Sequence, residues 1–450
     1  RSSGERTRLS DLLADLVRNG VAFHHAGLSG IHRRIIENAF RDGKIKVLTA
    51  TPTLAFGVNL PARMVVISDY RRYEPGYGYY PISVLEYKQM IGRAGRPKYD
   101  EVGESILIAR TDEERDYLLT SFVLAKPERI WSKLGVERVL RSHVLATIAS
   151  EFAYSEQGVY EFFDKTLYAF QYDLRAIKGV IARILKFLYE EGMIRYERDF
   201  IRATEFGLRV SQLYIDPVSA VIIRDALERR APKITNLSFL HMIAHTPDMS
   251  PKVRPTSSQI DQIALFTEEH RDEFFFDVPD EWIDRIDYEE FLGEVKTALV
   301  LNAWIEEYSE DDIIEHFGVE PGDLYHLTET AKWLLYASYE LAKLLGHKNL
   351  LPKLAELMER VDKGVKAELI PLARLEGVGR VRARILYNAG LKTIRDLKRA
   401  SIDKLMSLPL IGPRIAKRIK EQVGGKISQE EWKRLTETKK QREQQLLTEY

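Results

Sequence analysis

The sequence predicts a multidomain protein of the α/β plus α class, with one parallel-sheet domain followed by mainly helical domains. Short apolar strands alternate with amphipathic helices over residues 1–126, as a parallel sheet requires. The pattern beyond residue 126 is mostly helical, and 450 residues are too many for one hydrophobic core. The expected domains are residues 1–126, 127–216, 217–370 and 371–425, followed by a polar tail at 426–450.

Charge is balanced over the whole chain but not along it. The sequence has 67 basic and 67 acidic residues, yet residues 266–315 hold 18 acidic and 3 basic ones. Residues 371–426 hold 14 basic and 4 acidic residues, a surplus suited to phosphates, whereas the acidic block is interpreted as a solvated face. The absence of cysteine excludes disulfides and thiolate metal sites. No apolar run reaches the ~20 residues of a membrane span, so we expect a cytoplasmic protein with no membrane partner.

The first domain is predicted from its alternating elements. Strands are expected at residues 21–23, 46–49, 64–68 and 105–109, and helices at residues 9–19, 33–40 and 84–91. Thr51 before Pro52 is a helix start with a threonine cap, and the free N–H groups there suit a phosphate; a capped helix without ligand is the alternative. His24 and His25 are neighbours on a strand and face opposite sides, which argues against a metal site.

The segment Gln89–Arg96, with the sequence QMIGRAGR, is the strongest indication of chemistry. Arg93 and Arg96 lie three residues apart behind Gln89, and Gly92 lets the backbone approach a ligand. An arginine presents a planar, permanently charged fork that neutralises charge developing on a transferred phosphoryl group. We interpret Arg96 as an arginine finger, although a lone pattern of this kind also occurs at solvated helix starts.

Residues 69–81 are predicted to form a protruding hairpin with a turn rich in glycine and proline. The segment has four tyrosines within eight residues, and Tyr77 and Tyr79 are candidates to stack on a base pair and help to part it. An aromatic loop packed on a neighbouring domain is the alternative.

Residues 127–216 look like a winged helix. Helices are expected at residues 139–152, from 159, and at 176–191, followed by a wing at 193–203. The last helix ends in the acidic residues Glu190 and Glu191, which would repel DNA phosphates. A scaffolding role is therefore favoured over insertion of this helix into a DNA groove.

Residues 217–370 are expected to form a helical bundle interrupted by a turn-rich segment at 246–256. On one of its helices His326 and Trp333 stand seven residues apart, on a face turned about 100° from the apolar stripe. An indole there is suited to stacking on a base, and a core position is the alternative.

Residues 371–425 carry two segments that resemble helix-hairpin-helix units. The first has the sequence LEGVGRVRAR and includes Arg380, Arg382 and Arg384; the second, LPLIGPRIA, includes Arg414. Such hairpins expose backbone N–H groups at a helix start, which clamp phosphates without regard to sequence. An ordinary basic helix is the alternative, but the surplus of ten positive charges favours nucleic acid.

The segments VAFHHAGL (21–28), TATPTLAFGVNLP (49–61) and QMIGRAGRP (89–97) together resemble motifs IV, V and VI of superfamily 2 helicases. The sequences of these motifs are most similar to those of the Ski2-like branch and its archaeal Hjm-type DNA helicases, and the resemblance covers nearly the whole chain. It implies a second RecA-like domain at residues 1–126 and a ratchet bundle at residues 217–370.

The resemblance also implies roles for residues. Thr51 and Thr53 would contact the tracking strand, and Gly57, Asn59 and Gly92 would contact ATP. Trp333 matches the tryptophan of the ratchet helix, but His326 stands where the family has an arginine, which weakens a cationic contact at neutral pH. Arg382 and Arg384 match an R-A-R element that holds the single strand.

The sequence has neither a G-x-x-x-x-G-K-[ST] phosphate loop nor an acidic D-E-x-[DH] box for Mg²⁺. We therefore expect a carboxy-terminal portion whose first RecA-like domain, with the magnesium ligands, lies outside these residues. No metal site is predicted in this chain, which is expected to be inactive by itself.

The predicted function is that of an ATP-dependent 3′–5′ DNA helicase that acts as a monomer on single-stranded and forked DNA in repair and recombination. The alternatives are an RNA helicase of the same branch and a non-catalytic DNA-binding module. In the tail, Gln444, Leu447 and Tyr450 resemble a sliding-clamp peptide that lacks its second aromatic residue.

Overall fold

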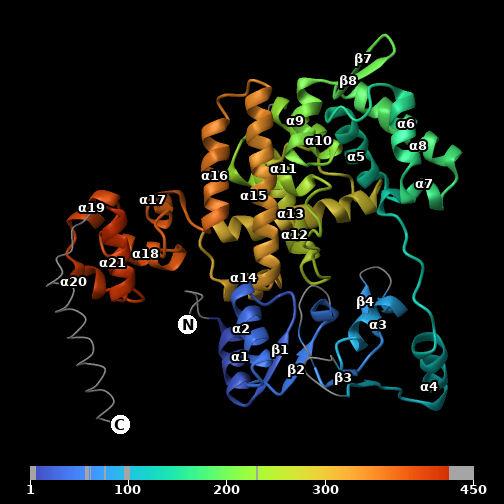
Figure 1. Cartoon of the computed structure of the whole chain (residues 1–450). Helices are drawn as coiled ribbons and strands as arrows, with labels where there is room; N and C mark the ends of the chain where they lie inside the picture. Colours follow the sequence, from blue (N-terminus) through green and yellow to red (C-terminus); the bar gives the residue numbers. More distant parts are fainter. Residues whose placement is uncertain are drawn as a thin grey trace. The chain divides into compact units, whose positions relative to one another are not determined.

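The computed structural model describes residues 7–55, 60, 62–74, 78–95, 102–229 and 232–424 (Figure 1). The chain divides into two compact units. One comprises Arg6–Lys133 with Glu320–Asp323, and the other comprises Leu134–Val319 with the chain from Leu324 onward.

The first unit has the α/β pattern expected from the sequence. Strand β1 pairs in parallel with β2, and β3 pairs in parallel with β6. Its elements are α1 (Arg8–Arg18), β1 (Val21–His24), α2 (Gly30–Arg41), β2 (Val47–Ala50), η1 (Pro52–Ala55), β3 (Met64–Ile67), β4 (Arg71–Glu74), β5 (Gly78–Pro81), α3 (Val84–Ile91), β6 (Glu104–Leu107), α4 (Asp112–Leu118) and η2 (Leu119–Val123). The predicted strands and helices are confirmed within two residues, except that α2 begins three residues before the predicted start at residue 33.

Apolar side chains form two small cores in the first unit. Leu28 and Ile36 are buried beside β1, while Ile67, Tyr87 and Phe122 are buried beside β3. A serine cap with a glutamate three residues later, Ser83 and Glu86, begins α3 with a capping box. The start of this helix is thus fixed by local sequence, and its end carries the arginine segment.

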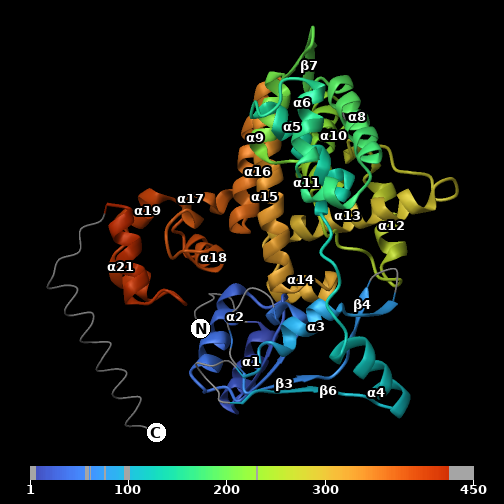
Figure 2. The same ribbon diagram turned by 45° about the vertical axis from the view of Figure 1, so that its right-hand side comes forward.

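The second unit begins with a cluster of short helices and an antiparallel hairpin. The elements are α5 (Glu137–Ala149), α6 (Glu156–Asp164), α7 (Leu167–Gln171), α8 (Leu174–Glu190), β7 (Ile194–Glu197), β8 (Phe200–Ala203) and α9 (Glu205–Leu213). Gly192 ends α8 with φ at +69°, and the β7–β8 hairpin projects from the unit (Figures 1 and 2). Three helices and a hairpin follow the predicted order.

A helical bundle continues this unit. It comprises α10 (Pro217–Glu228), α11 (Asn236–His245), α12 (Ile260–Glu269), α13 (Arg285–Ile305), α14 (Glu310–Phe317), α15 (Pro321–Leu344) and α16 (Leu351–Lys363). Helix α13 is exposed in its first turns and almost wholly buried from Phe291 onward, and one apolar core runs from Leu140 to Val361. Not every acidic residue of the 266–315 block is solvated, because Glu273 and Glu294 are buried in ion pairs with Lys233 and Lys252.

The last helices pack around a core of their own, which extends from Val365 to Val423. They are η5 (Ala367–Leu369), α17 (Ile370–Ala373), α18 (Arg380–Asn388), α19 (Ile394–Arg399), α20 (Ile402–Met406) and α21 (Pro413–Gln422). Two hairpins precede α18 and α21, at the positions that the sequence predicts for the two units.

Within the described residues, no single helix is long and apolar enough to cross a membrane. The consecutive helices α9 and α10, which are bent by 116°, together have the length and apolar composition of a membrane span, but only by these two criteria.

Candidate functional site

The arginine segment after α3 is fixed to the amino ends of two parallel strands. The Arg93 carbonyl accepts a hydrogen bond from the amide of Ala62 (3.2 Å), and the amide of Gly95 donates to the Ala62 carbonyl (3.2 Å). Gly95 has φ at +67°, and a Cβ there would lie 2.6 Å from the backbone of Gly103. Only glycine lets these two backbones meet, so the path of the chain around Arg93 is set by backbone contacts.

The end of α3 also lies beside the predicted phosphate-contacting turn. Helix α3 packs against η1, which begins directly after Thr51, and the amide of Thr51 donates to the His24 carbonyl at the end of β1 (3.1 Å). The prediction of a capped helix at Thr51 is corrected to a short 3₁₀ turn over the described residues, because the Leu54 amide bonds back three residues to the Thr51 carbonyl.

The two adjacent histidines have different surroundings. His24 is buried, and its Nε2 lies 3.0 Å from Oε1 of Glu37 on α2. His25 is partly exposed and stacks on Phe23, with the ring centroids 5.5 Å apart. They thus serve separate contacts, and no group of three metal-binding side chains occurs in the part of the chain that the structure describes.

Several predicted site residues lie outside the described residues. They are Arg96, Gly57, Asn59 and Tyr77, together with the clamp-like residues Gln444, Leu447 and Tyr450. Of the others in this region, Gln89 and Gly92 are exposed at the end of α3, and Arg93 is half-buried. Thr53 lies within η1. The described residues of the second and third motifs therefore lie at η1 and α3, and the first motif lies on β1, whose His24 carbonyl accepts from the Thr51 amide.

The predicted hairpin is present as the antiparallel pair β4 and β5, with Arg72 opposite Tyr80 and Tyr73 opposite Tyr79. Tyr79 and Tyr80 are 72% and 62% exposed. Because consecutive strand residues point to opposite faces, a tyrosine projects from each side of the hairpin. At its base, Asp69 binds Arg71 and Arg110, and these arginines lower the pKa of the Asp69 carboxyl. The hairpin thus has a fixed base and two accessible rings.

Helix α15 places its two predicted DNA contacts in unlike environments. His326 is exposed beside Tyr325, with ring centroids 5.8 Å apart. Trp333 is half-buried against the core, and its indole N–H donates to the carbonyl of Leu213 at the end of α9 (3.0 Å). Tyr325, which sequence reasoning did not single out, is 57% exposed and is a second aromatic residue next to His326.

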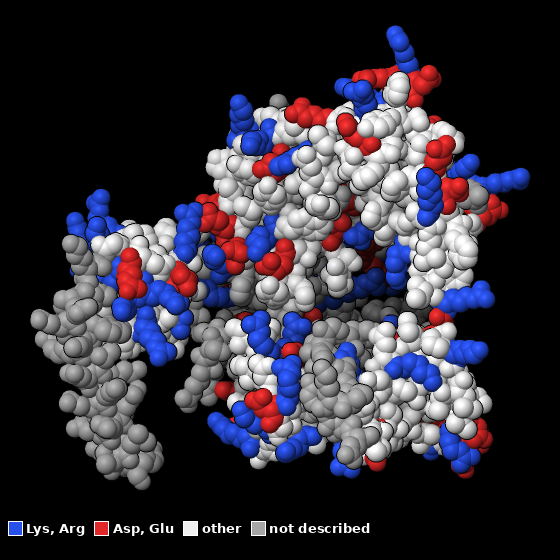
Figure 3. Space-filling model, viewed as in Figure 1, with Lys and Arg blue, Asp and Glu red and all other residues white. Residues whose placement is uncertain are grey.

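In the helix-hairpin-helix domain, exposed cations lie on α19, α20 and α21: Arg395, Lys398, Arg399, Lys404, Arg414 and Arg418. Arg374 and Lys392, outside these helices, are exposed as well, and Arg374 and Arg418 pair with Glu359 and Glu376. Lysine and arginine side chains gather on the face of this domain at the left of Figure 3. Arg414 follows Pro413, the first residue of α21, so its charge lies next to the free N–H groups of a helix start.

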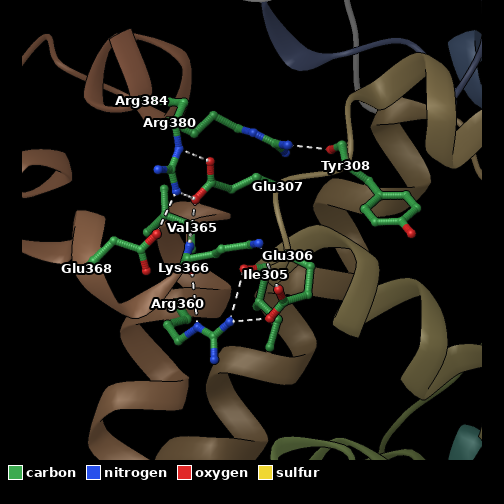
Figure 4. Close-up of polar contacts among 10 residues, drawn as sticks. All are labelled: Ile305, Glu306, Glu307, Tyr308, Arg360, Val365, Lys366, Glu368, Arg380 and Arg384. Carbon is green, nitrogen blue, oxygen red and sulfur yellow. Dashed lines mark hydrogen bonds and ion pairs between the residues drawn. The ribbon is translucent and has the colours of Figure 1, made fainter. Parts of the chain in front are cut away.

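The three arginines of the first hairpin, by contrast, are engaged within the protein. Arg382 donates to the carbonyls of Leu410 (2.8 Å) and Gly377 (3.0 Å), which joins the two hairpins. Arg384 binds two carboxylates, and Arg380 donates to the carbonyl of Tyr308 on the bundle side (Figure 4). Sequence reasoning missed these acceptors, and the only signal for them was the acidic pair Glu306 and Glu307 after the long helix.

Four family models match successive parts of the chain. The helicase conserved C-terminal domain matches residues 4–98, and a helix-turn-helix domain matches residues 103–195. Domain 4 of archaeal helicases matches residues 237–364, and the SAM-like helix-hairpin-helix tandem matches residues 369–424.

Longer archaeal proteins are similar over most of the chain. The ATP-dependent DNA helicase Hel308 of Methanocella arvoryzae is 43% identical over 94% of the chain, which spans 57% of that relative. The proteins of the same name from Pyrococcus abyssi and Caldivirga maquilingensis are 41% and 40% identical over 94% of the chain, which spans 58% and 57% of them. The chain spans a little over half the length of these relatives. Over most of its length the chain is therefore similar to a part of these archaeal ATP-dependent DNA helicases.

Proposed function

We propose that this chain supplies the second RecA-like domain and the DNA-handling domains of an ATP-dependent DNA helicase of the Hjm type. The observation that carries the proposal is the fixed arginine segment: backbone bonds to Ala62 and the contact of Gly95 with Gly103 hold Arg93 beside η1. The similarity to Hel308 proteins over 94% of the chain supports the same assignment.

ATP would meet this chain through Gln89, Gly92, Arg93 and Arg96 at the end of α3, and through Gly57 and Asn59 after η1. Arginine forks in these positions would offset charge on the phosphates, and a preorganised backbone avoids the cost of ordering them during the reaction. ATP hydrolysis would supply the free energy for movement. Mg²⁺ would be held by acidic residues of the first RecA-like domain.

DNA would be contacted by residues of η1, the bundle, the β4–β5 hairpin and the helix-hairpin-helix domain, in the last by exposed cations such as Arg414. Thr51 and Thr53 at η1 and the bundle residues His326 and Trp333 would contact the tracking strand, and the hairpin with Tyr77 and Tyr79 would part the duplex. The exposure of Tyr79 favours this role, since a ring must be accessible to stack on a base.

Residues 127–216 would act as a winged helix that braces the bundle. The order of α5, α6, α8 and the β7–β8 hairpin supports this, as does the core that the region shares with the bundle.

The proposed activity is 3′–5′ movement on single-stranded and forked DNA in replication-coupled repair and recombination, by a monomer in the cytoplasm associated with the nucleoid. A sliding clamp would bind through Gln444, Leu447 and Tyr450. Replacement of Leu447 and Tyr450 by alanine without loss of clamp binding would dismiss that contact.

The test is unwinding of a 3′-tailed DNA fork by the full-length protein, with a matched RNA fork and the Arg96→Ala variant. ATP-dependent unwinding of DNA that the variant loses, with DNA binding retained, is expected. Equal unwinding of the RNA fork would favour an RNA helicase. Tight DNA binding without ATP-driven unwinding would leave a non-catalytic DNA-binding module.

A further inference from the structure

The junction between the bundle and the helix-hairpin-helix domain is built from charged residues with fixed partners (Figure 4). Arg384 on α18 donates its Nε (2.8 Å) and one Nη (2.6 Å) to the two oxygens of Glu307, just beyond α13. The same Nη reaches Glu368 on η5 (2.9 Å). Arg384 is 29% exposed and Glu307 is 14% exposed, so water has limited access to the pair.

Glu307 is held in an unfavourable position that only its contacts explain. Its φ of +69° is in the left-handed region, where a glutamate is strained and a glycine would not be. It also follows the carboxyl end of α13, where the helix dipole disfavours an anion. A strained, electrostatically disfavoured glutamate persists only where its carboxylate is used.

The carboxylate of Glu307 is fully engaged. Besides Arg384, the amide of Lys366 donates to it (3.0 Å). Burial alone would raise the pKa of Glu307, but the hydrogen bonds from Arg384 and from the Lys366 amide lower it below its usual value. Removing Arg384 to bind a phosphate would leave this mostly buried carboxylate without a counter-charge, which is strongly unfavourable.

Two further arginines join the same contact. The Arg380 guanidinium lies over the ring of Trp304, 4.1 Å from its centroid, and donates to the Tyr308 carbonyl. Arg360 on α16 is buried and binds Glu306 (2.7 Å) and the Ile305 carbonyl (3.1 Å). The end of α13 is thereby tied to α16 and to α18.

We infer that Arg384 and Arg380 are positioning residues that hold the helix-hairpin-helix domain on the bundle. Phosphate binding by this domain then falls to the exposed cations of α19, α20 and α21, such as Arg395 and Arg414. This division of roles rests on the proposed DNA function, whereas the attachment itself does not. The domain can guide DNA in a fixed direction only if its orientation on the bundle is held.

The first test measures the attachment without DNA. Because the chain has no native cysteine, spin labels at Glu356→Cys on α16 and Lys404→Cys on α20 report one distance between the two domains by pulsed electron paramagnetic resonance. The parent is expected to give one narrow distance distribution. Arg384→Gln, which loses both Glu307 and Glu368, should broaden it most, and Glu307→Gln should broaden it less because Glu368 still binds Arg384. An unchanged distribution in both single variants would overturn the inference.

The second test separates a positioning role from a phosphate contact. Binding of the chain to single-stranded DNA is measured against salt concentration, with Arg414→Gln as the matched control. Loss of one phosphate contact reduces the salt slope by about 0.7. This reduction is expected for Arg414→Gln and not for Arg384→Gln. A reduced slope in Arg384→Gln with tighter binding in Glu307→Gln would show instead that Glu307 competes with DNA for Arg384.

Two controls keep the tests decisive. Far-UV circular dichroism verifies that each variant is folded. Arg384→Lys keeps the charge but loses the bidentate hydrogen bond, so it should broaden the distance distribution less than Arg384→Gln does. Failure of the parent to bind DNA would refute the proposed function, and the label distances would still decide whether Arg384 and Glu307 hold the domains together.

Discussion

His241 should make the bundle sensitive to mild acid. This residue on α11 is fully buried, and its ring centroid lies 4.5 Å from that of Phe274 and 4.6 Å from that of Phe291. Burial lowers its pKa to about 3; the charge of Glu294, 3.7 Å from Nε2, opposes the shift, and the charges of His245 and Lys252 add to it.

The sign and size of the effect follow from linkage. The unfolded chain, with an ordinary histidine pKa of about 6.5, takes up a proton that the folded protein does not bind. Stability conferred by neutral His241 is therefore complete above pH 6.5 and is lost as the pH falls toward 3. Between pH 7 and pH 5 the loss amounts to about 2 kcal/mol.

The assay is urea unfolding of the parent and of His241→Phe, followed by far-UV circular dichroism at pH 7 and pH 5. Phenylalanine suits the aromatic surroundings and does not titrate. Between pH 7 and pH 5 the free energy of unfolding should therefore fall by about 2 kcal/mol less in the variant than in the parent, whatever the variant's stability at pH 7. The exposed His326→Gln serves as the control and should behave as the parent does. The same loss in His241→Phe as in the parent would refute the reasoning.

Three further substitutions test the geometry. Gly364→Ala should destabilise the protein by about 2 to 4 kcal/mol in urea unfolding, because Gly364 has φ at +63° and a Cβ would lie 2.4 Å from the ring of Trp304; a change below about 0.5 kcal/mol would contradict that contact. Trp333→Phe should cost about 1 to 2 kcal/mol by leaving the Leu213 carbonyl without its donor, yet it should keep most affinity for single-stranded DNA, measured by fluorescence anisotropy, if the ring stacks on a base. Tyr79→Ala should slow unwinding of a fork several-fold while DNA-stimulated ATP hydrolysis stays at the parent rate; an equal loss of both rates would assign the ring to the ATPase cycle.

The two parallel strand pairs of the first unit were predictable because their signals are local. Apolar runs such as Met64–Ile67 and the Ser83 cap of α3 act over a few residues, and the structure has them in place. The turn after Thr51 was predicted wrongly as a helix. A threonine followed by proline begins an α-helix and a 3₁₀ turn equally well, so the sequence does not reveal which follows.

The contacts of the candidate site residues were harder to predict from the sequence than the secondary structure. The basic surplus of residues 371–426 indicates nucleic acid, but a charge count does not distinguish Arg414 at the surface from Arg384 in an ion pair. Arg384 and Glu307 are 77 residues apart in the chain, and only the packing of α18 against the end of α13 brings them together. The contact of Trp333 with the Leu213 carbonyl at the end of α9 was equally hidden, because helical periodicity does not show which neighbouring helix covers this face of α15.

The continuous core from Leu140 to Val361 bears on how the protein folds and breaks down. Residues 127–216 and the bundle are separate blocks in sequence, but neither can bury its apolar face without the other. They should melt together and resist proteolytic separation as one cooperative block. The helix-hairpin-helix domain, with its own core from Val365 to Val423, is a second block. A mutation in the helix-turn-helix region would therefore also weaken the packing of α15, although the two segments are far apart in the sequence.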